Sequence, residues 1–182
     1  YLPKAIVSGD FYWVQQTGNK VLFAAIDCTG HGVPGALMSV ACANALDQAV
    51  KELEGAVPGQ ILDRTNELVI AYFEANQEEI KNGMDIAYCK WNPKSKELEF
   101  SGAYNPLWLW MLNKREWKTV KGDRQPIGNF DKRIQFTSHK MDIGEDCWIY
   151  LFSDGFQDQF GGEDGKKLKS IGFRSLLESQ TD

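Results

Sequence analysis

Residues Val21–Gly35 read VLFAAIDCTGHGVPG, and this stretch decides both the fold and the candidate site. Six apolar residues, Val21–Ile26, form a continuous run of the length expected for a buried strand. Asp27 ends the run, and its loop contains glycines that let backbone atoms approach a ligand closely. Pro34 then opens a helical pattern that we expect to extend to about Lys51. An ionised carboxylate beside a buried strand is costly unless it is paired or binds a metal ion.

Two other stretches repeat this pattern of an apolar run that ends in an acid beside a glycine. The repetition is informative, because a single strand–Asp–loop sequence also occurs where the Asp only caps a turn or a helix. Trp148–Phe152 leads into Ser153–Gly155, and Ala5–Val7 leads into Ser8–Asp10. The three acids in these motifs are hard oxygen ligands, and no Cys or His cluster accompanies them. Such a ligand set suits Mg²⁺ or Mn²⁺ better than zinc.

The hydrophobic periodicity predicts an α+β fold. Two strands, Val7–Val14 and Val21–Asp27, form a hairpin through the turn Thr17–Lys20, so Asp10 and Asp27 lie on neighbouring strands. Two helices follow, over Gly35–Lys51 and Gln60–Asn76. The remaining predicted elements are the strands Asp85–Trp91, Glu97–Ala103, Leu107–Leu112, Glu116–Val120, Ile134–Met141 and Cys147–Ser153, a loop over Phe156–Gly165, and a last helix over Ile171–Ser179. Successive hairpins with two intervening helices indicate an antiparallel β-sandwich flanked by helices, in α-β-β-α layers.

The composition excludes several classes of protein. The 182 residues, 43% hydrophobic and 25% charged, are typical of one globular domain spanning residues 1–182. A net charge of −5 gives no electrostatic footprint for nucleic acid, and no apolar run is long enough to span a membrane. The four scattered cysteines (Cys28, Cys42, Cys89 and Cys147) indicate reduced thiols in a cytoplasmic protein. The sequence also lacks the motifs of serine hydrolases, P-loop NTPases and zinc proteases.

Three motifs together resemble those of a known enzyme family. Ser8–Phe11, Asp27–Gly32 and Phe152–Gly155 have the order and approximate spacing of the metal-dependent protein phosphatases, in the bacterial 2C-like (PPM) branch that includes sporulation stage II protein E and the sigma-factor regulators. Gly83–Asp85 and Gln125–Gly128 extend the resemblance over almost the whole chain. It implies hydrolysis of phosphoserine or phosphothreonine on a protein by a water that two Mn²⁺ or Mg²⁺ ions activate.

The resemblance also implies roles for individual residues. Asp27 would bridge the two ions, the backbone carbonyl of Cys28 would bind one of them, and Asp154 the other. Asp10 would hold metal directly or through water. The family commonly has Gly where Cys28 stands, but a backbone oxygen is available with either side chain. His31 either protonates the leaving serine oxygen or only braces the loop.

Several points stay open from the sequence. Asp85 is either an acid beside the metal ligands or a turn residue, and Lys4 either meets the phosphate or is solvated. The family carries a further metal-binding Asp in an Asp-Asp-x-x motif that is absent up to Asp182, so we expect a segment truncated at both ends, with weakened metal binding. The resemblance implies a phosphorylated anti-anti-sigma-type regulator as substrate and a sensor domain upstream. The alternative is a non-catalytic phosphatase-like domain that binds a partner.

Overall fold

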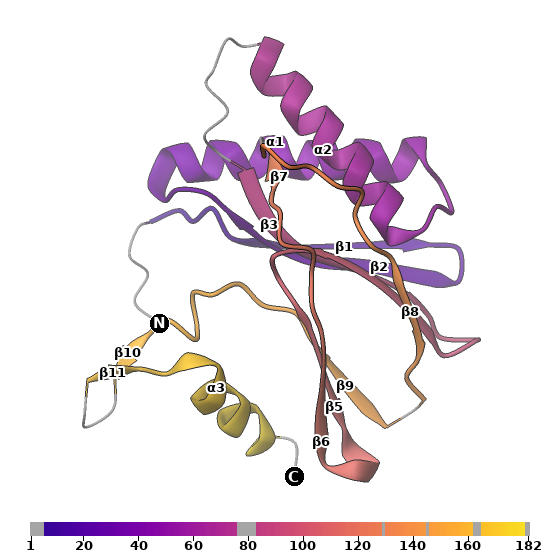
Figure 1. Cartoon of the computed structure of the whole chain (residues 1–182), viewed down its shortest axis with the longest axis vertical. Helices are drawn as coiled ribbons and strands as arrows, with labels where there is room; N and C mark the ends of the chain where they lie inside the picture. Colours follow the sequence, from indigo (N-terminus) through magenta and orange to yellow (C-terminus); the bar gives the residue numbers. More distant parts are fainter. Residues whose placement is uncertain (1–5, 76–82, 129, 145, 162–164, 181–182) are drawn as a thin grey trace.

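Two antiparallel sheets lie face to face, with helices on their outer sides (Figure 1). The computed structural model describes residues 6–75, 83–128, 130–144, 146–161 and 165–180. In chain order the elements are β1 (Phe11–Thr17), β2 (Lys20–Cys28), α1 (Gly32–Glu52), α2 (Pro58–Ala75), β3 (Gly83–Asn92), β4 (Glu97–Ala103), β5 (Leu107–Met111), a short 3-10 helix (Leu112–Lys114), β6 (Glu116–Val120), β7 (Ile127–Gly128), β8 (His139–Asp142), β9 (Cys147–Tyr150), β10 (Phe160–Gly161), β11 (Lys166–Lys167) and α3 (Lys169–Glu178).

The first sheet has the strand order β1-β2-β3-β4-β8, and β7 pairs with the beginning of β3. The predicted hairpin turn is confirmed, since Thr17 pairs with Lys20 and Gly18 takes a positive φ of 59° in the turn. The first strand of the hairpin runs over Phe11–Thr17 instead of the predicted Val7–Val14, so Asp10 precedes the strand. Helices α1 and α2 cover one face of this sheet (Figure 1). The side chains of β2 alternate as a half-buried strand requires, with every second residue facing the helices. The core here includes Leu22, Ala24, Ile26, Cys42, Leu46, Leu62, Val69, Met84 and Ile86.

The second sheet, in the order β6-β5-β9, packs against the opposite face of the first. Buried residues of β3, β4 and β5 form the core between the sheets, namely Ala87, Cys89, Leu98, Phe100, Leu107 and Leu109. On the outer side of the second sheet, Trp108 packs against Phe173 of α3, with ring centroids 5.8 Å apart. Trp108 of β5 thus faces α3 rather than the first sheet. The predicted α-β-β-α layering is confirmed.

The strand predicted from Ile134 is wrong over its first half, because β8 begins only at His139. Upstream of β8 the backbone bonds to side chains instead of to a neighbouring strand. Gln125 exchanges two hydrogen bonds with the backbone of Ile134, of 2.7 and 3.0 Å, and the Asp63 carboxylate accepts the N–H of Phe136 at 3.1 Å. These side chains satisfy backbone groups that a strand ladder would otherwise pair.

Other boundaries differ less from the prediction. The strand β9 ends at Tyr150 rather than at Ser153, and the predicted loop Phe156–Gly165 contributes β10 to a two-stranded sheet with β11. Asn76, the expected end of the second helix, lies outside the described residues. Within the described part of the chain, none of the helices has the length and apolarity to cross a membrane.

Candidate metal-binding active site

Four aspartates gather where β1, β2 and β3 meet at one end of the first sheet. The β2–β3 register places Asp27 directly opposite Asp85. Asp10 immediately precedes β1, whose first residue, Phe11, pairs with Ile26 beside Asp27. The charges of Asp10, Asp154 and Asp85 all act on Asp27. The structure thus brings together the three acids predicted from the sequence, and it adds Asp85, which the sequence left open.

The proximity of these acids changes their protonation. Burial, followed by the negative charges of Asp10 and Asp154, raises the pKa of Asp27 from 3.8 to about 7, and a hydrogen bond with Asp10 adds to the effect. Burial and the charge of Asp154 raise the pKa of Asp85 to about 6. Carboxylates that repel one another in this way favour a bound cation, which stabilises their charged forms.

Asp10 is held in place by two serines. The Ser153 hydroxyl donates a hydrogen bond of 2.6 Å to Asp10 Oδ2, and the Asp10 N–H donates one of 3.0 Å to Ser8 Oγ. The first bond joins residues 143 positions apart, so it fixes the segment after β9 against the segment before β1. Sequence reasoning missed Ser153 as a functional residue. Its position directly before Asp154 in the third motif was the signal available.

The loop after β2 has a tightly fixed backbone. Cys28 is 2% exposed and hydrogen-bonds with Cys42, so its thiol lies in the core under α1. Its carbonyl oxygen closely approaches Gly9, where an added Cβ would lie only 2.7 Å from that oxygen. Both the N–H and the hydroxyl of Thr29 donate to the Gly83 carbonyl, at 2.9 and 3.1 Å. The close approach of the Cys28 carbonyl explains why a glycine precedes Asp10, because a side chain at Gly9 would collide with that backbone oxygen.

His31 stands exposed immediately before α1. No hydrogen bond from its side chain caps α1. Its imidazole is therefore open to a substrate at the same loop that carries Cys28. Asp154 is also exposed, and Lys4 lies outside the described residues.

The donor types at this edge fit a divalent cation. Carboxylate oxygens and a backbone carbonyl are the ligands that Mg²⁺ and Mn²⁺ prefer. Among the residues that the structure describes, however, no three His, Cys, Asp or Glu side chains stand close enough together to enclose a metal ion. The donor chemistry of the cluster therefore fits the ion, although the described side chains do not by themselves form a group of three that encloses it.

The layered fold and the cluster of Asp10, Asp27, Asp85 and Asp154 (the acidic edge) together define a PP2C-like (PPM) phosphatase domain. Stage II sporulation protein E (SpoIIE) is the family that matches, over residues 17–181. The SiaA-PP2C domain of Pseudomonas aeruginosa is 30% identical, with a TM-score of 0.84 over 96% of this chain and 67% of that chain. This chain belongs to the SpoIIE family of PPM serine phosphatases.

More distant structures share the fold. The RsbU and RsbW domains of Rv1364c from Mycobacterium tuberculosis give a TM-score of 0.74 at 16% identity, over 98% of this chain and 47% of that chain. RsbX, crystallised in complex with magnesium, gives 0.64 at 14% identity, over 98% of this chain and 82% of that chain. At such identities the likeness shows the fold alone. A comparison with curated proteins found no match.

Proposed function

We propose that this domain is a metal-dependent phosphatase that removes phosphate from phosphoserine or phosphothreonine on a regulatory protein. The observation that carries the proposal is the gathering of Asp10, Asp27 and Asp154 at one end of the first sheet, beside the Cys28 carbonyl. These four groups would hold two Mn²⁺ or Mg²⁺ ions. When bound, such ions activate a water and neutralise charge on the phosphate.

The chain's own residues position the reaction. The antiparallel register of β2 and β3 fixes Asp27 opposite Asp85, and the Ser153 hydroxyl orients Asp10. His31 is exposed beside the same loop, so its imidazolium is placed to give a proton to the departing serine oxygen. Asp85 faces Asp27 and is placed to accept a hydrogen bond from a water at the site.

The test is hydrolysis of a phosphoserine peptide by this chain with Mn²⁺, with Mg²⁺ and with a chelator. We expect turnover that depends on the added metal and is lost in Asp154→Asn, whose exposed side chain can change without disturbing the core. A folded wild-type chain with no turnover at saturating metal would instead favour the non-catalytic, partner-binding alternative. The lack of a metal-enclosing group of three such side chains among the described residues is the observation that favours this alternative.

The finer identity of the substrate is also a proposal. Membership of the SpoIIE family supports a phosphorylated regulator of the anti-anti-sigma type as substrate. The same resemblance supports a cytoplasmic location and a sensor domain in the same chain. Dephosphorylation of one candidate regulator, but not of an unrelated phosphoprotein at equal concentration, would test the substrate.

A further inference from the structure

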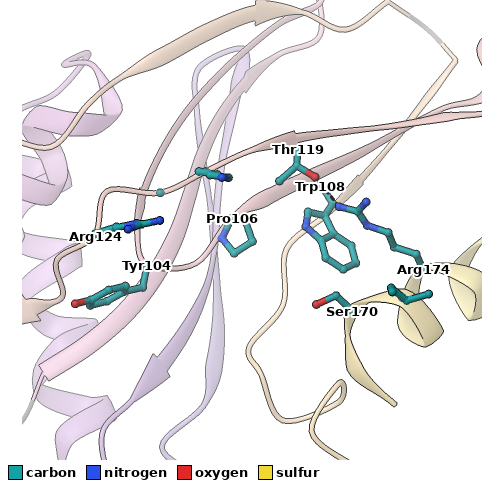
Figure 2. A pocket seen from close by; sticks show the side chains of 10 residues that line it. Tyr104, Pro106, Trp108, Thr119, Arg124, Ser170 and Arg174 are labelled. Atoms are coloured by element: carbon teal, nitrogen blue, oxygen red, sulfur yellow. Dashed lines mark hydrogen bonds between the residues drawn. The ribbon is translucent and has the colours of Figure 1, made fainter. Parts of the chain in front are cut away.

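A cavity of about 510 Å³ lies between the second sheet and α3 (Figure 2). Its walls come from the turn after β4, from β5 and β6, from the loop after β6, and from the first turns of α3. The side chains that line it include Tyr104, Trp108, Thr119, Lys121, Arg124 and Arg174.

Two walls of the cavity lie near residues of the candidate active site. Tyr104 directly follows Ala103, which pairs with Ile86, so Tyr104 lies at the same end of the sheet as Asp85. At the other wall, Trp108 packs against Phe152, with ring centroids 4.4 Å apart. Phe152 precedes Asp154 by two residues. A peptide with its phosphoserine at the acidic edge therefore has this cavity next to it.

Three cationic side chains line the cavity, and none of its lining residues is acidic. Arg174 stacks over Trp108 at 4.3 Å and donates a hydrogen bond of 2.6 Å to Thr119 Oγ1. Its Nε atom is buried and has no acceptor among the described residues. Lys121 and Arg124 are exposed, and neither side chain forms a hydrogen bond or ion pair within the described part of the chain.

The acid nearest to these cations in the sequence is engaged elsewhere. Both carboxylate oxygens of Asp123 accept hydrogen bonds from Thr137, at 2.7 Å from its N–H and 3.0 Å from its hydroxyl. On the facing wall, Ser170 and Ile171 belong to the first turn of α3. That turn contains no acidic residue and no side chain caps it, so its amides add to the positive potential.

We propose that this cavity is a recognition subsite for an oxyanion, a carboxylate or a second phosphate, that the phosphoprotein substrate carries near its phosphoserine. The inference rests on the proposed phosphatase function. A chain with a net charge of −5 repels an acidic partner at long range, so a local cluster of cations supplies the attraction. Arg174, held over the Trp108 ring and bonded to Thr119, keeps its guanidinium pre-organised for such a group, which lowers the entropy lost on binding.

The test uses a double variant, Lys121→Gln with Arg124→Gln, because both side chains are exposed and their loss should not disturb the core. The control is Lys51→Gln with Lys94→Gln, which changes the net charge equally at exposed positions on α1 and in the β3–β4 turn. Three substrates are compared: a phosphoserine peptide with glutamates beside the phosphoserine, the same peptide with glutamines, and p-nitrophenyl phosphate. A fourth peptide, with a second phosphoserine in place of the glutamates, distinguishes phosphate from carboxylate.

We expect the double variant to lower kcat/KM for the acidic peptide roughly 10- to 100-fold, mainly through KM. Its rates with the glutamine peptide and with p-nitrophenyl phosphate should stay within about twofold of wild type, as should all rates of the control. Equal losses on the acidic and glutamine peptides, or an equal loss in the control, would overturn the inference.

A binding measurement keeps this result separate from the proposed function. Fluorescence anisotropy of a labelled acidic peptide without phosphoserine, in metal-free buffer, requires no catalysis. We expect wild type and the control to bind the peptide, and the double variant to bind it at least about tenfold more weakly. If no substrate is hydrolysed but this difference persists, the phosphatase proposal fails and the subsite stands. Equal binding by all three proteins would reject the subsite.

Discussion

Asp27 and Asp85 face each other directly across β2 and β3, although like charges at opposed positions destabilise an antiparallel pair. Burial and neighbouring negative charges raise the pKa of both carboxyls, to about 7 for Asp27 and about 6 for Asp85. The arrangement therefore lowers the stability of the metal-free protein at neutral pH. It is the arrangement expected of a site that is stabilised by a bound cation.

The first prediction concerns Asp27→Asn. Removing this carboxylate should abolish metal-dependent phosphatase activity, because Asp27 lies close enough to Asp10, Asp85 and Asp154 for all three charges to act on it. It should also raise the melting temperature of the metal-free protein at neutral pH, since an amide carries no charge to repel Asp10 and Asp154. Calorimetry and a phosphopeptide assay measure the two effects. Wild-type turnover in the variant would contradict the proposed mechanism.

The second prediction concerns pH. Because the folded-state pKa of Asp27 lies above 3.8, the folded protein binds more protons than the unfolded protein between about pH 4 and pH 7. This group's contribution to stability is therefore fully present below that window and is lost as pH rises through about 7. The raised pKa of Asp85 has the same effect, so its contribution to stability is lost as pH rises through about 6.

The measurement is the melting temperature across this range in metal-free buffer, for wild type and for Asp27→Asn. The difference between the two proteins isolates Asp27 from the other titrating groups. We expect the variant to gain stability relative to wild type as pH rises through the window, and saturating Mn²⁺ to reverse that order at neutral pH. A difference that is independent of pH would contradict the raised pKa.

The third prediction concerns Ser153→Ala. The variant loses the 2.6 Å hydrogen bond that orients Asp10, and residues that orient metal ligands typically contribute about 10- to 100-fold to metal affinity or activity. We therefore expect a higher Mn²⁺ concentration for half-maximal activity, with the rate at saturating metal largely restored. Ser179→Ala, which removes an exposed hydroxyl bonded to the Leu176 carbonyl, is the matched control. An unchanged metal dependence would exclude a positioning role for Ser153.

The fourth prediction separates the two roles considered for His31. If the exposed imidazole protonates the leaving oxygen, His31→Gln should slow hydrolysis of a phosphoserine peptide by about 10²-fold or more. Hydrolysis of p-nitrophenyl phosphate should change little, because its leaving group is stable without a proton. An equal loss on both substrates, together with a lower melting temperature, would assign His31 to bracing the loop.

The fifth prediction concerns Gly9→Ala. The added methyl group would lie 2.7 Å from the Cys28 carbonyl oxygen, so the backbone beside the site must shift. We expect a loss of roughly 1–3 kcal/mol in the free energy of unfolding, together with weaker metal binding. The control is Gly161→Ala, where the added group meets nothing within 4 Å. Denaturation by urea measures the stability of both variants. Equal stabilities of Gly9→Ala and Gly161→Ala would show that the close approach is not required.

Much of the fold follows from local patterns in the sequence. The hairpin turn at Thr17–Lys20, the two long helices and the strand Glu97–Ala103 lie where alternation, periodicity and turn residues predict them. The extended segment from Ile134 does not pair as predicted, because Gln125 and Asp63 bond its backbone from elsewhere in the chain. No periodicity within a segment carries that information.

The sequence by itself determined the residue types of the site, since each of Asp10, Asp27 and Asp154 stands in its own motif at the end of an apolar run. Only the tertiary structure decided that Asp85 faces Asp27, that Ser153 holds Asp10, and that Lys121, Arg124 and Arg174 line one cavity. The physical reason is that these relationships depend on strand register and on how the two sheets and α3 pack together. Neighbouring residues in the sequence fix neither of them.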